Sequence, residues 1–323
     1  HSELGSQAFL RQWYFVLRHG RVGHCQAKSP MKNIIVVTGG AGFIGSNLIE
    51  TLLKKTKYKI ISLDNYSTGS TKNHIRSKRV RYIKCNTIDI SKKLHKHNKK
   101  ILVIFHFGEF ARIFQSFKNF SKCFDSNSLG SKEVFKFCLD NKIKLIYSAT
   151  SASIGNKGND SNLSPYAFTK FKNLELLENL KKWFKMKYEI IYFYNVYGKR
   201  QIMTGDMATV IGIFENQYLN NKPLTVVRPG TQSRRFTHID DTIDVCLKAW
   251  KADKCAHYSI SHKDRYSIYH VAKLFNSKIR YLAPRKGERF ASALTNMSFN
   301  NKVIKKFGKI SLKEYITSFI KKH

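Results

Sequence analysis

The chain alternates short apolar runs with longer stretches in which apolar residues recur at helical spacing. The short runs are rich in β-branched residues and have the length of buried strands; they cover 33–38, 59–63, 81–84, 101–105 and 144–147. The longer stretches predict helices over 43–55, 125–140 and 165–185. Strands that alternate with helices predict an α/β fold, in which right-handed crossovers join a doubly wound parallel sheet.

The regular alternation ends near Gly198, and loops are predicted over 199–206 and 228–235. We therefore expect a sheet domain over 31–198 and a smaller α/β substrate domain over 199–323, which is discontinuous and can return strands to the sheet. Residues 1–30 fit neither part. They hold an aromatic run between arginines and lack the flanks of a signal peptide, so we interpret them as an expression leader or an extension outside the fold.

Three glycines at regular spacing follow the first predicted strand. Gly39 allows a tight turn, Gly42 lets the backbone approach a pyrophosphate, and Gly45 lets helix and strand pack closely. The N-terminus of the next helix adds N–H donors for the phosphates. Asp64 ends the second strand, about 20 residues further on, where a carboxylate binds the adenosine ribose and repels a 2′-phosphate. These features predict a Rossmann-type dinucleotide site that prefers NAD to NADP.

Tyr166 and Lys170 are four residues apart in a predicted helix, so they share one face of it. A free tyrosine is a poor base at neutral pH because its pKa is about 10, and a nearby ammonium group lowers that pKa. Such a pair can exchange a proton with a substrate hydroxyl. The same spacing is common in lysine-rich chains, where it marks a solvated helix face; the neighbouring dinucleotide motif favours the chemical interpretation.

Composition narrows the choice of partners. The net charge of +37 comes from scattered lysines without a zinc-finger or RNA-binding motif, so nucleic-acid binding is not favoured, but anionic nucleotides should be attracted. The six cysteines have no metal-ligand spacing, so we expect no metal and a reducing, cytoplasmic location. No apolar run approaches the roughly 18 residues of a membrane span, so no membrane association is expected.

Several further motifs occur in a fixed order. The cofactor loop spans 38–46, LDNYSTG spans 63–69, SPYAFTK spans 164–170, YNVYG spans 194–198, RRFTHIDD spans 234–241 and RKGE spans 285–288. Together they resemble the extended short-chain dehydrogenase/reductases, and among these the NAD-dependent nucleotide-sugar epimerases such as UDP-glucose 4-epimerase. The resemblance runs from Lys32 to the end of the chain.

The resemblance implies a role for each matching residue. Tyr166 is the acid and base, Lys170 binds the nicotinamide ribose and lowers the pKa of the tyrosine, and Thr150 hydrogen-bonds the reacting sugar hydroxyl. The residues implied to bind the nucleotide sugar are Thr150, Asn195, Arg234 and Arg285. The residues implied to bind NAD are Gly39, Gly42, Phe43, Ile44, Gly45, Asp64, Asn65, Asn86, Thr87, Phe107, Gly108 and Lys170.

The chain also departs from the family pattern. Asn86 stands where the family usually has Asp at the adenine, although its amide oxygen can still accept a hydrogen bond. Glu109 replaces a small residue near the nicotinamide, either as a solvated loop residue or as a second titrating group. Ser151 and Ala152 stand where the 4,6-dehydratases have Asp and Glu, and Ala152 also replaces the Glu of UDP-glucuronate decarboxylases.

The function implied is epimerisation of a UDP-hexose at C4, through a transient 4-keto sugar, by a homodimer that pairs the helices at 125–140 and 165–185. Other nucleotide-sugar enzymes of the superfamily stay open, above all a 6-epimerase of an ADP-heptose, because Gly205–Ala208 is reminiscent of that group. A protein that binds a dinucleotide or a nucleic acid without catalysis is the alternative from another class. The sequence alone does not identify the sugar.

Overall fold

The computed structural model describes residues 31–153, 161–284 and 303–323 of the chain. An eight-stranded sheet with the order β14-β11-β6-β5-β4-β1-β2-β3 runs through the molecule, and every pairing in it is parallel. Its strands are β1 (Ile34–Thr38), β2 (Lys59–Asp64), β3 (Val80–Lys84), β4 (Ile101–His106), β5 (Lys144–Thr150), β6 (Tyr188–Phe193), β11 (His257–Ser261) and β14 (Val303–Phe307). The predicted doubly wound parallel α/β fold is confirmed.

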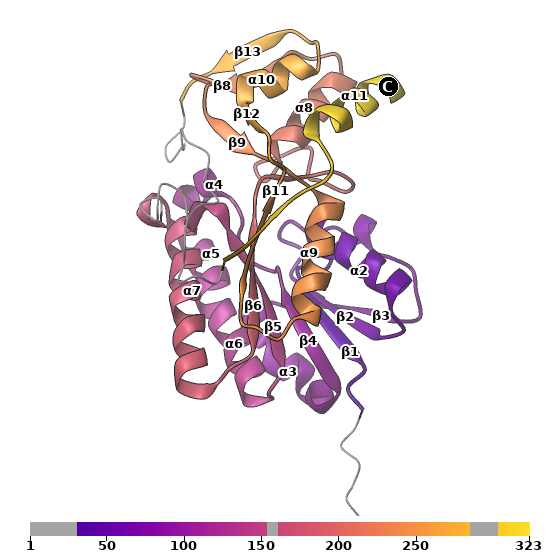
Figure 1. Ribbon diagram of the computed structural model, residues 1–323, viewed down its shortest axis with the longest axis vertical. Coiled ribbons are helices and arrows are strands. Elements are labelled where there is room, and N and C mark those ends of the chain that lie inside the picture. The colour runs from indigo at the N-terminus through magenta and orange to yellow at the C-terminus, as the bar shows by residue number, and fades with distance from the viewer. Residues whose placement is uncertain (1–30, 154–160, 285–302) are drawn as a thin grey trace, which may run out of the picture. The chain divides into compact units, whose positions relative to one another are not determined.

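Helices cover both faces of this sheet (Figure 1). On one face lie α3 (Ile90–Leu94), α6 (Ser131–Asp140) and α7 (Pro165–Phe184), and on the other lie α2 (Phe43–Lys55) and α9 (Ile239–Lys251). Alternate residues of β1 enter the two cores: Val36 belongs to the cluster that contains Val134 and Leu174, whereas Val37 belongs to the cluster that contains Leu48. This alternation explains why the central strands are continuously apolar, since both faces of a doubly wound sheet are buried.

A smaller group of elements follows the main sheet and packs around its own apolar cluster, which includes Phe214, Leu224, Phe236 and Phe275. Its helices are α8 (Val210–Leu219), α10 (Ile268–Leu274) and α11 (Leu312–Lys322). Three two-stranded sheets join it: β8 (Leu224–Val227) with β13 (Ile279–Leu282), β9 (Ser233–Arg235) with β12 (Arg265–Ser267), and β7 (Val196–Tyr197) with β10 (Thr237–His238). The division of the chain into two domains at residue 198 stays a prediction.

Two predicted elements differ from the structure. The helix predicted over 125–140 is part of a longer helical stretch: α5 (Phe120–Phe124) passes into a π-helical segment, Asp125–Gly130, and then into α6. It starts earlier because Phe120, Cys123 and Phe124 continue the apolar spacing upstream. The segment 228–235 was predicted to be a loop, but its last three residues form strand β9. This strand pairs with β12, which lies about 30 residues further along the chain. A short helix, α4 (Ile113–Lys118), was not predicted.

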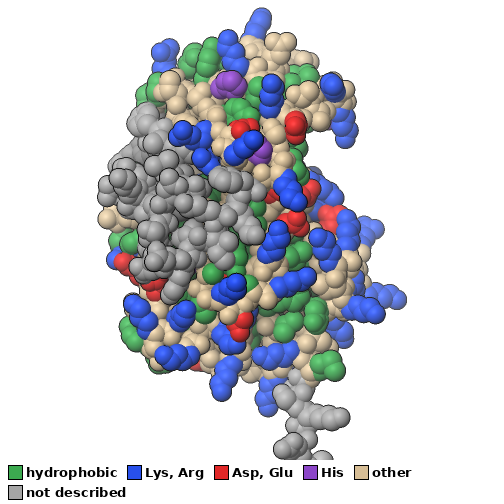
Figure 2. Space-filling model, viewed as in Figure 1, with side chains coloured by type: hydrophobic (Ala, Val, Ile, Leu, Met, Phe, Trp, Pro, Cys, Tyr) green, Lys and Arg blue, Asp and Glu red, His purple; other side chains and the backbone are tan. Residues whose placement is uncertain are grey.

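Charged side chains do not gather in one patch on the face shown in Figure 2, where Lys and Arg are spread among polar and apolar groups. The five cysteines in the described part of the chain are unpaired, and all except Cys255 are buried. Among the described helices, none is long and apolar enough to cross a membrane.

Candidate active site

The predicted catalytic and cofactor residues gather at the carboxyl edge of the main sheet. The loop 39–42 follows β1, Asp64 ends β2, Phe107 and Gly108 follow β4, and Thr150 ends β5. Because these strands are parallel neighbours, their carboxyl ends lie along one edge, where ligands bind in open α/β sheets. The chain therefore places these loops along the edge where open α/β sheets bind their ligands.

The glycine loop is fixed by close backbone contacts. Gly39 has a φ of +69°, and a Cβ there would lie 2.9 Å from the backbone of Phe107 and Gly108. At Gly45 a Cβ would lie 2.2 Å from the carbonyl oxygen of Gly39, so helix α2 can begin against the loop only without a side chain at this position. No side chain caps the first turn of α2, whose N-cap residue is Gly42. The geometry fits a loop that leaves its helix N-terminus for phosphate.

Asp64 holds the glycine loop and the next turn in place. Its carboxylate accepts hydrogen bonds from the backbone N–H of Ala41 (2.9 Å) and of Tyr66 (2.8 Å). Burial raises the pKa of Asp64, and these hydrogen bonds oppose the rise. A Cβ at Gly69 would lie 2.8 Å from the carboxylate, so this glycine lets the following loop close over Asp64.

The remaining predicted adenine-side residues lie beside Asp64. Asn65 donates a hydrogen bond from Nδ2 to Oδ1 of Asn86 at 3.0 Å, and Thr87 starts the short 3-10 turn that follows. A stack of two aromatic rings next to them was not predicted from the sequence. His74 stacks on Tyr82 with ring centroids 3.7 Å apart, and its Nε2 lies 3.1 Å from the hydroxyl oxygen of Tyr66. No motif marks this stack, because its members come from three separate segments.

Tyr166 lies in the first turn of α7, which begins at Pro165 behind the N-cap residue Ser164. The Ser164 hydroxyl accepts a hydrogen bond from Ala167 N, and the backbone N–H of Tyr166 donates to Oγ of Ser116 at 3.3 Å. The Thr150 side chain lies close enough to the Tyr166 hydroxyl to lower the pKa of that hydroxyl. The structure therefore brings together Tyr166 and Thr150, the two residues that are predicted to contact the reacting sugar hydroxyl.

The expected effect of Lys170 on Tyr166 is not found in this structure. Burial raises the pKa of Tyr166 to about 12, and the hydrogen bond with Thr150 and the charge of Arg112 only partly oppose the rise. The ammonium group of Lys170 instead forms an ion pair with Glu109 and donates to the carbonyl oxygen of Ser148 at 2.5 Å. The prediction that Lys170 lowers the pKa of Tyr166 stays a prediction, because in this structure its ammonium group is paired with the Glu109 carboxylate.

Glu109 is buried, so the first interpretation of it as a solvated residue is wrong. Only 2% of its side chain is exposed, and its Oε1 accepts hydrogen bonds from Ser131 Oγ (2.8 Å), Tyr147 OH (3.0 Å) and Asn173 Nδ2 (3.3 Å). Sequence reasoning could identify the unusual residue but not its partners, which come from β5, α6 and α7. A buried carboxylate of this kind requires several donors, and the structure supplies them.

A chain of hydrogen bonds links Glu109 to the end of β1. Ser131 donates its proton to Glu109, so its oxygen accepts from Nε2 of His106 at 3.0 Å. The other ring nitrogen of His106, Nδ1, then accepts from the Thr38 hydroxyl at 2.7 Å, while the Thr38 oxygen accepts from the N–H groups of Phe107 and Gly108. Burial lowers the pKa of His106 to about 4, so the ring is neutral and this assignment is self-consistent.

Two of the predicted substrate residues, Asn195 and Arg234, lie on neighbouring segments. Asn195, with a φ of +35°, is exposed and donates from Nδ2 to the carbonyl oxygen of Arg235 at 2.8 Å. Arg234 is buried in β9, and its Nη1 donates to the carbonyl oxygen of Ser233 at 2.9 Å. Arg285 lies outside the described residues.

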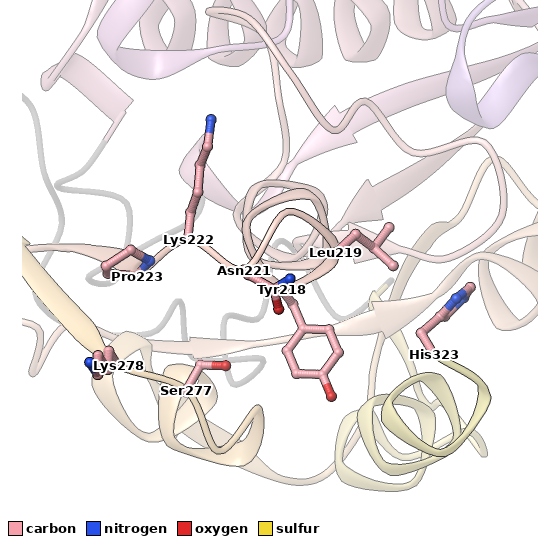
Figure 3. A pocket seen from close by; sticks show the side chains of 8 residues that line it. All are labelled: Tyr218, Leu219, Asn221, Lys222, Pro223, Ser277, Lys278 and His323. Atoms are coloured by element: carbon pink, nitrogen blue, oxygen red, sulfur yellow. The ribbon is translucent and has the colours of Figure 1, made fainter.

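A pocket of about 400 Å³ lies in the smaller group of elements, around Tyr218, Lys222, Ser277 and Lys278. Figure 3 shows the Lys222 side chain pointing away from Tyr218 and Ser277, so the polar groups do not converge on one point. None of the predicted catalytic residues lines it. Across residues 31–153, 161–284 and 303–323, no group of three or more His, Cys, Asp or Glu side chains is placed to hold a metal ion.

The site combines a glycine loop on a doubly wound sheet with an acid at the end of the second strand. It also has a Tyr-x-x-x-Lys helix beside a threonine. These features define an extended short-chain dehydrogenase/reductase. The family model for the NAD dependent epimerase/dehydratase family matches residues 35–261. The chain belongs to this family. The members of the family are enzymes, and the cofactor of this chain is NAD.

Individual relatives agree with the family. The chain is 33% identical over 228 residues to a Bacillus subtilis (strain 168) protein named an uncharacterized UDP-glucose epimerase, covering 65% of this chain and 70% of that protein. It is 30% identical over 226 residues to an ADP-L-glycero-D-manno-heptose-6-epimerase of Brachyspira hyodysenteriae (66% and 70%). Among solved structures, the UDP-glucuronic acid 4-epimerase of Bacillus cereus, in complex with UDP-glucuronic acid and NAD, superposes with a TM-score of 0.74 at 27% identity (90% and 99%).

Proposed function

We propose that this protein epimerises a nucleotide-diphosphate sugar, and that the substrate is a UDP-hexose inverted at C4. The observation that carries the proposal is the placement of Thr150, at the end of β5, beside Tyr166, in the first turn of α7, at the same sheet edge as the glycine loop. A sugar hydroxyl placed between this pair and the cofactor would meet a proton acceptor on one side, which is the arrangement that oxidation of an alcohol needs.

In the proposed reaction, the Tyr166 phenolate takes the proton of the sugar hydroxyl, and Thr150 holds that hydroxyl in line. NAD, when bound, supplies the acceptor for the hydride of the sugar carbon and then the donor that returns it to the opposite face of the keto sugar. Tyr166 gives the proton back to the new hydroxyl, so no net oxidation occurs. Because the pKa of Tyr166 is raised to about 12, the basic form is scarce at neutral pH, and kcat/KM should rise as the pH rises.

The glycine loop, Asp64 and Lys170 are proposed to hold the cofactor. Asp64 keeps lone pairs for ribose hydroxyls besides those used by Ala41 and Tyr66, since a carboxylate has about four acceptor sites. Arg234, Asn195 and Arg285 are proposed to hold the nucleotide while the keto sugar turns. A guanidinium group suits phosphate oxygens because it offers paired donors in one plane.

The residues that follow Thr150 argue against the other reactions of this superfamily. Elimination of water needs an acid and a base beside the keto sugar, but Ser151 and Ala152 supply neither carboxylate, and both are buried behind the end of β5. A 6-epimerase that acts on an ADP-heptose stays the second candidate, because one relative carries that name. A binding protein without catalysis would not need the Tyr166–Thr150 pair.

The substitution Tyr166→Phe tests the proposal. It removes the hydroxyl and keeps the ring, so we expect turnover of UDP-glucose to fall at least about 100-fold, the scale of a lost acid–base group, while NAD stays bound. Turnover is read by NMR of the sugar products, and bound NAD by its release on denaturation. Tyr194→Phe is the control, since that hydroxyl is buried and pairs with Ser259. A Tyr166→Phe protein with near wild-type turnover would contradict the proposal.

We also propose that the protein is a homodimer that pairs helices α5 to α7. Phe120, Phe124 and Phe168 form a chain of ring contacts between α5 and α7, with centroids 4.5 and 6.2 Å apart. Phe120 is 55% exposed and Phe168 is 37% exposed, which leaves part of this aromatic cluster in water. A second copy of the same face would cover it.

The double substitution Phe120→Glu and Phe168→Glu should convert the dimer to a monomer, because it would place like charges at the centre of the contact. Light scattering after gel filtration measures the mass. Leu219→Glu, at an exposed apolar residue of α8, should leave the dimer intact. A wild-type protein that is monomeric at micromolar concentration would contradict the dimer.

A further inference from the structure

The two edges of the main sheet differ in charge. At the edge where the parallel strands begin, opposite the candidate active site, at least one exposed lysine lies within the three residues before each of the strands β1 to β6 and β11. We call this row the lysine edge. In the order of the strands from β11 to β2, it includes Lys254, Lys187, Lys142, Lys100, Lys32 and Lys57. At the edge where the strands end, the three residues after each of these strands contain one lysine, Lys263.

Backbone hydrogen bonds hold the segments of the lysine edge side by side. The N–H group of Asn33 donates to the carbonyl oxygen of Lys100 at 2.9 Å, and that of Lys59 donates to the carbonyl oxygen of Asn33 at 3.0 Å. The N–H group of Leu145 donates to the carbonyl oxygen of Lys187 at 3.1 Å. Because neighbouring strands are about 4.8 Å apart, the row from β11 to β3 is about 30 Å long. Figure 1 shows this edge at the lower end of the sheet, where α7 also ends.

Little negative charge balances the lysine edge. The three residues before each of these strands include no Asp or Glu. Within the described part of the chain, Lys187 is the one lysine of the row that forms an ion pair, with Asp253 at 2.7 Å. Like charges held this close repel one another and raise the free energy of the folded chain. An anionic partner would relieve this repulsion, so the edge favours contact with a negatively charged surface.

An exposed aromatic pair adjoins the lysine edge at the end of α7. Trp183 is 61% exposed and Phe184 is 57% exposed, and their ring centroids lie 6.2 Å apart. The exposed residues Lys182 and Lys185 flank the pair in the chain. Aromatic side chains, tryptophan above all, are stable at the headgroup level of a bilayer, and lysines beside them contact anionic headgroups. The pair therefore adds an apolar contact to one end of the charged row.

The residue types of the lysine edge favour a lipid surface over a nucleic acid. Nucleic-acid recognition relies strongly on arginine, whose guanidinium group binds phosphates and bases through paired donors. The one arginine within these described three-residue segments is Arg79. It donates to the carbonyl oxygens of Thr56 at 2.6 Å and Leu53 at 2.5 Å, so its guanidinium group binds the end of α2. The row of lysine charges with an aromatic pair at one end fits a flat anionic bilayer.

We propose that the lysine edge binds the surface of an anionic membrane, with Trp183 and Phe184 entering the headgroup region. The expectation of no membrane association rests on the lack of an apolar run long enough to span a bilayer, and surface binding requires no such run. In this orientation the opposite edge, with the glycine loop and Tyr166, faces away from the bilayer. The proposal goes beyond the proposed epimerase activity and does not depend on it.

The test is sedimentation of the full chain with vesicles of phosphatidylcholine and phosphatidylserine, compared with vesicles of phosphatidylcholine alone. The wild type should bind only the vesicles that contain phosphatidylserine. Raising the salt from about 0.1 M to about 1 M should release it, because the Debye length falls from about 10 to about 3 Å. The triple substitution Lys57→Glu, Lys100→Glu and Lys254→Glu should lower the affinity at least about 100-fold, the combined effect of three lysines near an anionic surface. Trp183→Gln should lower it about tenfold, as expected for a partly buried aromatic side chain.

The matched control is the triple substitution Lys222→Glu, Lys278→Glu and Lys313→Glu, which changes the net charge equally at exposed lysines of the smaller group of elements. It should bind vesicles as the wild type does, and circular dichroism checks that both triple variants fold. Equal losses in the two variants would mean that only the net charge matters and would overturn the proposal. A wild type that does not bind phosphatidylserine, or that binds single-stranded RNA and not vesicles, would also overturn it. If Trp183→Gln becomes monomeric but binds vesicles fully, the role of the aromatic pair at the bilayer is wrong.

Discussion

Two parts of the same sheet edge are built on different principles. At β1 and β2, the glycine loop is shaped by the backbone: Gly39 and Gly45 are required because a Cβ at either would meet main-chain atoms at 2.9 or 2.2 Å. At β4 and β5, the site is shaped by side-chain charge: Glu109 and Lys170 are 61 residues apart in sequence and meet in a buried ion pair. In the first part a side chain on either glycine would clash with the backbone. In the second part the loss of Glu109 or Lys170 would leave a buried charge unpaired.

This difference explains how each part can change. The glycine loop fits against the neighbouring backbone only with glycine at these positions, so its sequence stays close to the family pattern. A charge cluster can be rebuilt with other residues if the total charge is balanced, and here Glu109 enters with Tyr147, Asn173 and Ser131 as donors. The same overall chemistry is then compatible with a different distribution of charge around Tyr166.

The largest effect, a loss of NAD affinity, is expected from a substitution in the glycine loop. Gly45→Val would place a branched side chain against the carbonyl oxygen of Gly39, so the loop must move away from helix α2. We expect NAD binding to weaken at least about 100-fold, since the loop and the helix N-terminus form one phosphate site. Calorimetry measures the affinity. Thr51→Ala, further along α2, should bind NAD as the wild type does; an unchanged affinity in Gly45→Val would contradict the steric account.

An intermediate effect is expected in the charge cluster. Tyr147→Phe removes a donor to buried Glu109, so the free energy of unfolding should fall by about 1.5–3 kcal/mol, the range for a hydrogen bond to a charged group. Tyr194→Phe removes a hydrogen bond to the neutral Ser259 and should cost about 1 kcal/mol. Urea unfolding measures both. Equal losses would mean that Glu109 does not act as a buried charge.

The smallest effect is expected at a carboxylate outside both regions. Glu50 on α2 pairs with Lys54, Lys199 and Arg200, which lower its pKa from 4.5 to about 2 against the effect of burial. Its contribution to stability is therefore present above pH 4.5 and is lost as the pH falls through about 2. Glu50→Gln should cost less than about 1 kcal/mol at pH 7, as surface pairs do. A loss as large as that of Tyr147→Phe would contradict the distinction between surface and buried charge.

The sequence predicted the parts of the molecule that local rules determine. Apolar runs identified β1, β2 and β4, and glycine spacing with Asp64 identified the loop, because both depend on neighbours close in the chain. The partners of Glu109 could not be predicted, since they come from β5, α6 and α7. The raised pKa of Tyr166 could not be predicted either, because the burial that raises it is a property of the folded chain.

The most direct test of the account is proton NMR of the wild-type protein with UDP-glucose in D₂O. UDP-galactose is expected to form with protium at C4, because the hydride leaves and returns without exchange with solvent. The absence of a C4 epimer from UDP-glucose and from related UDP-sugars, or an epimer that carries deuterium at C4, would contradict it.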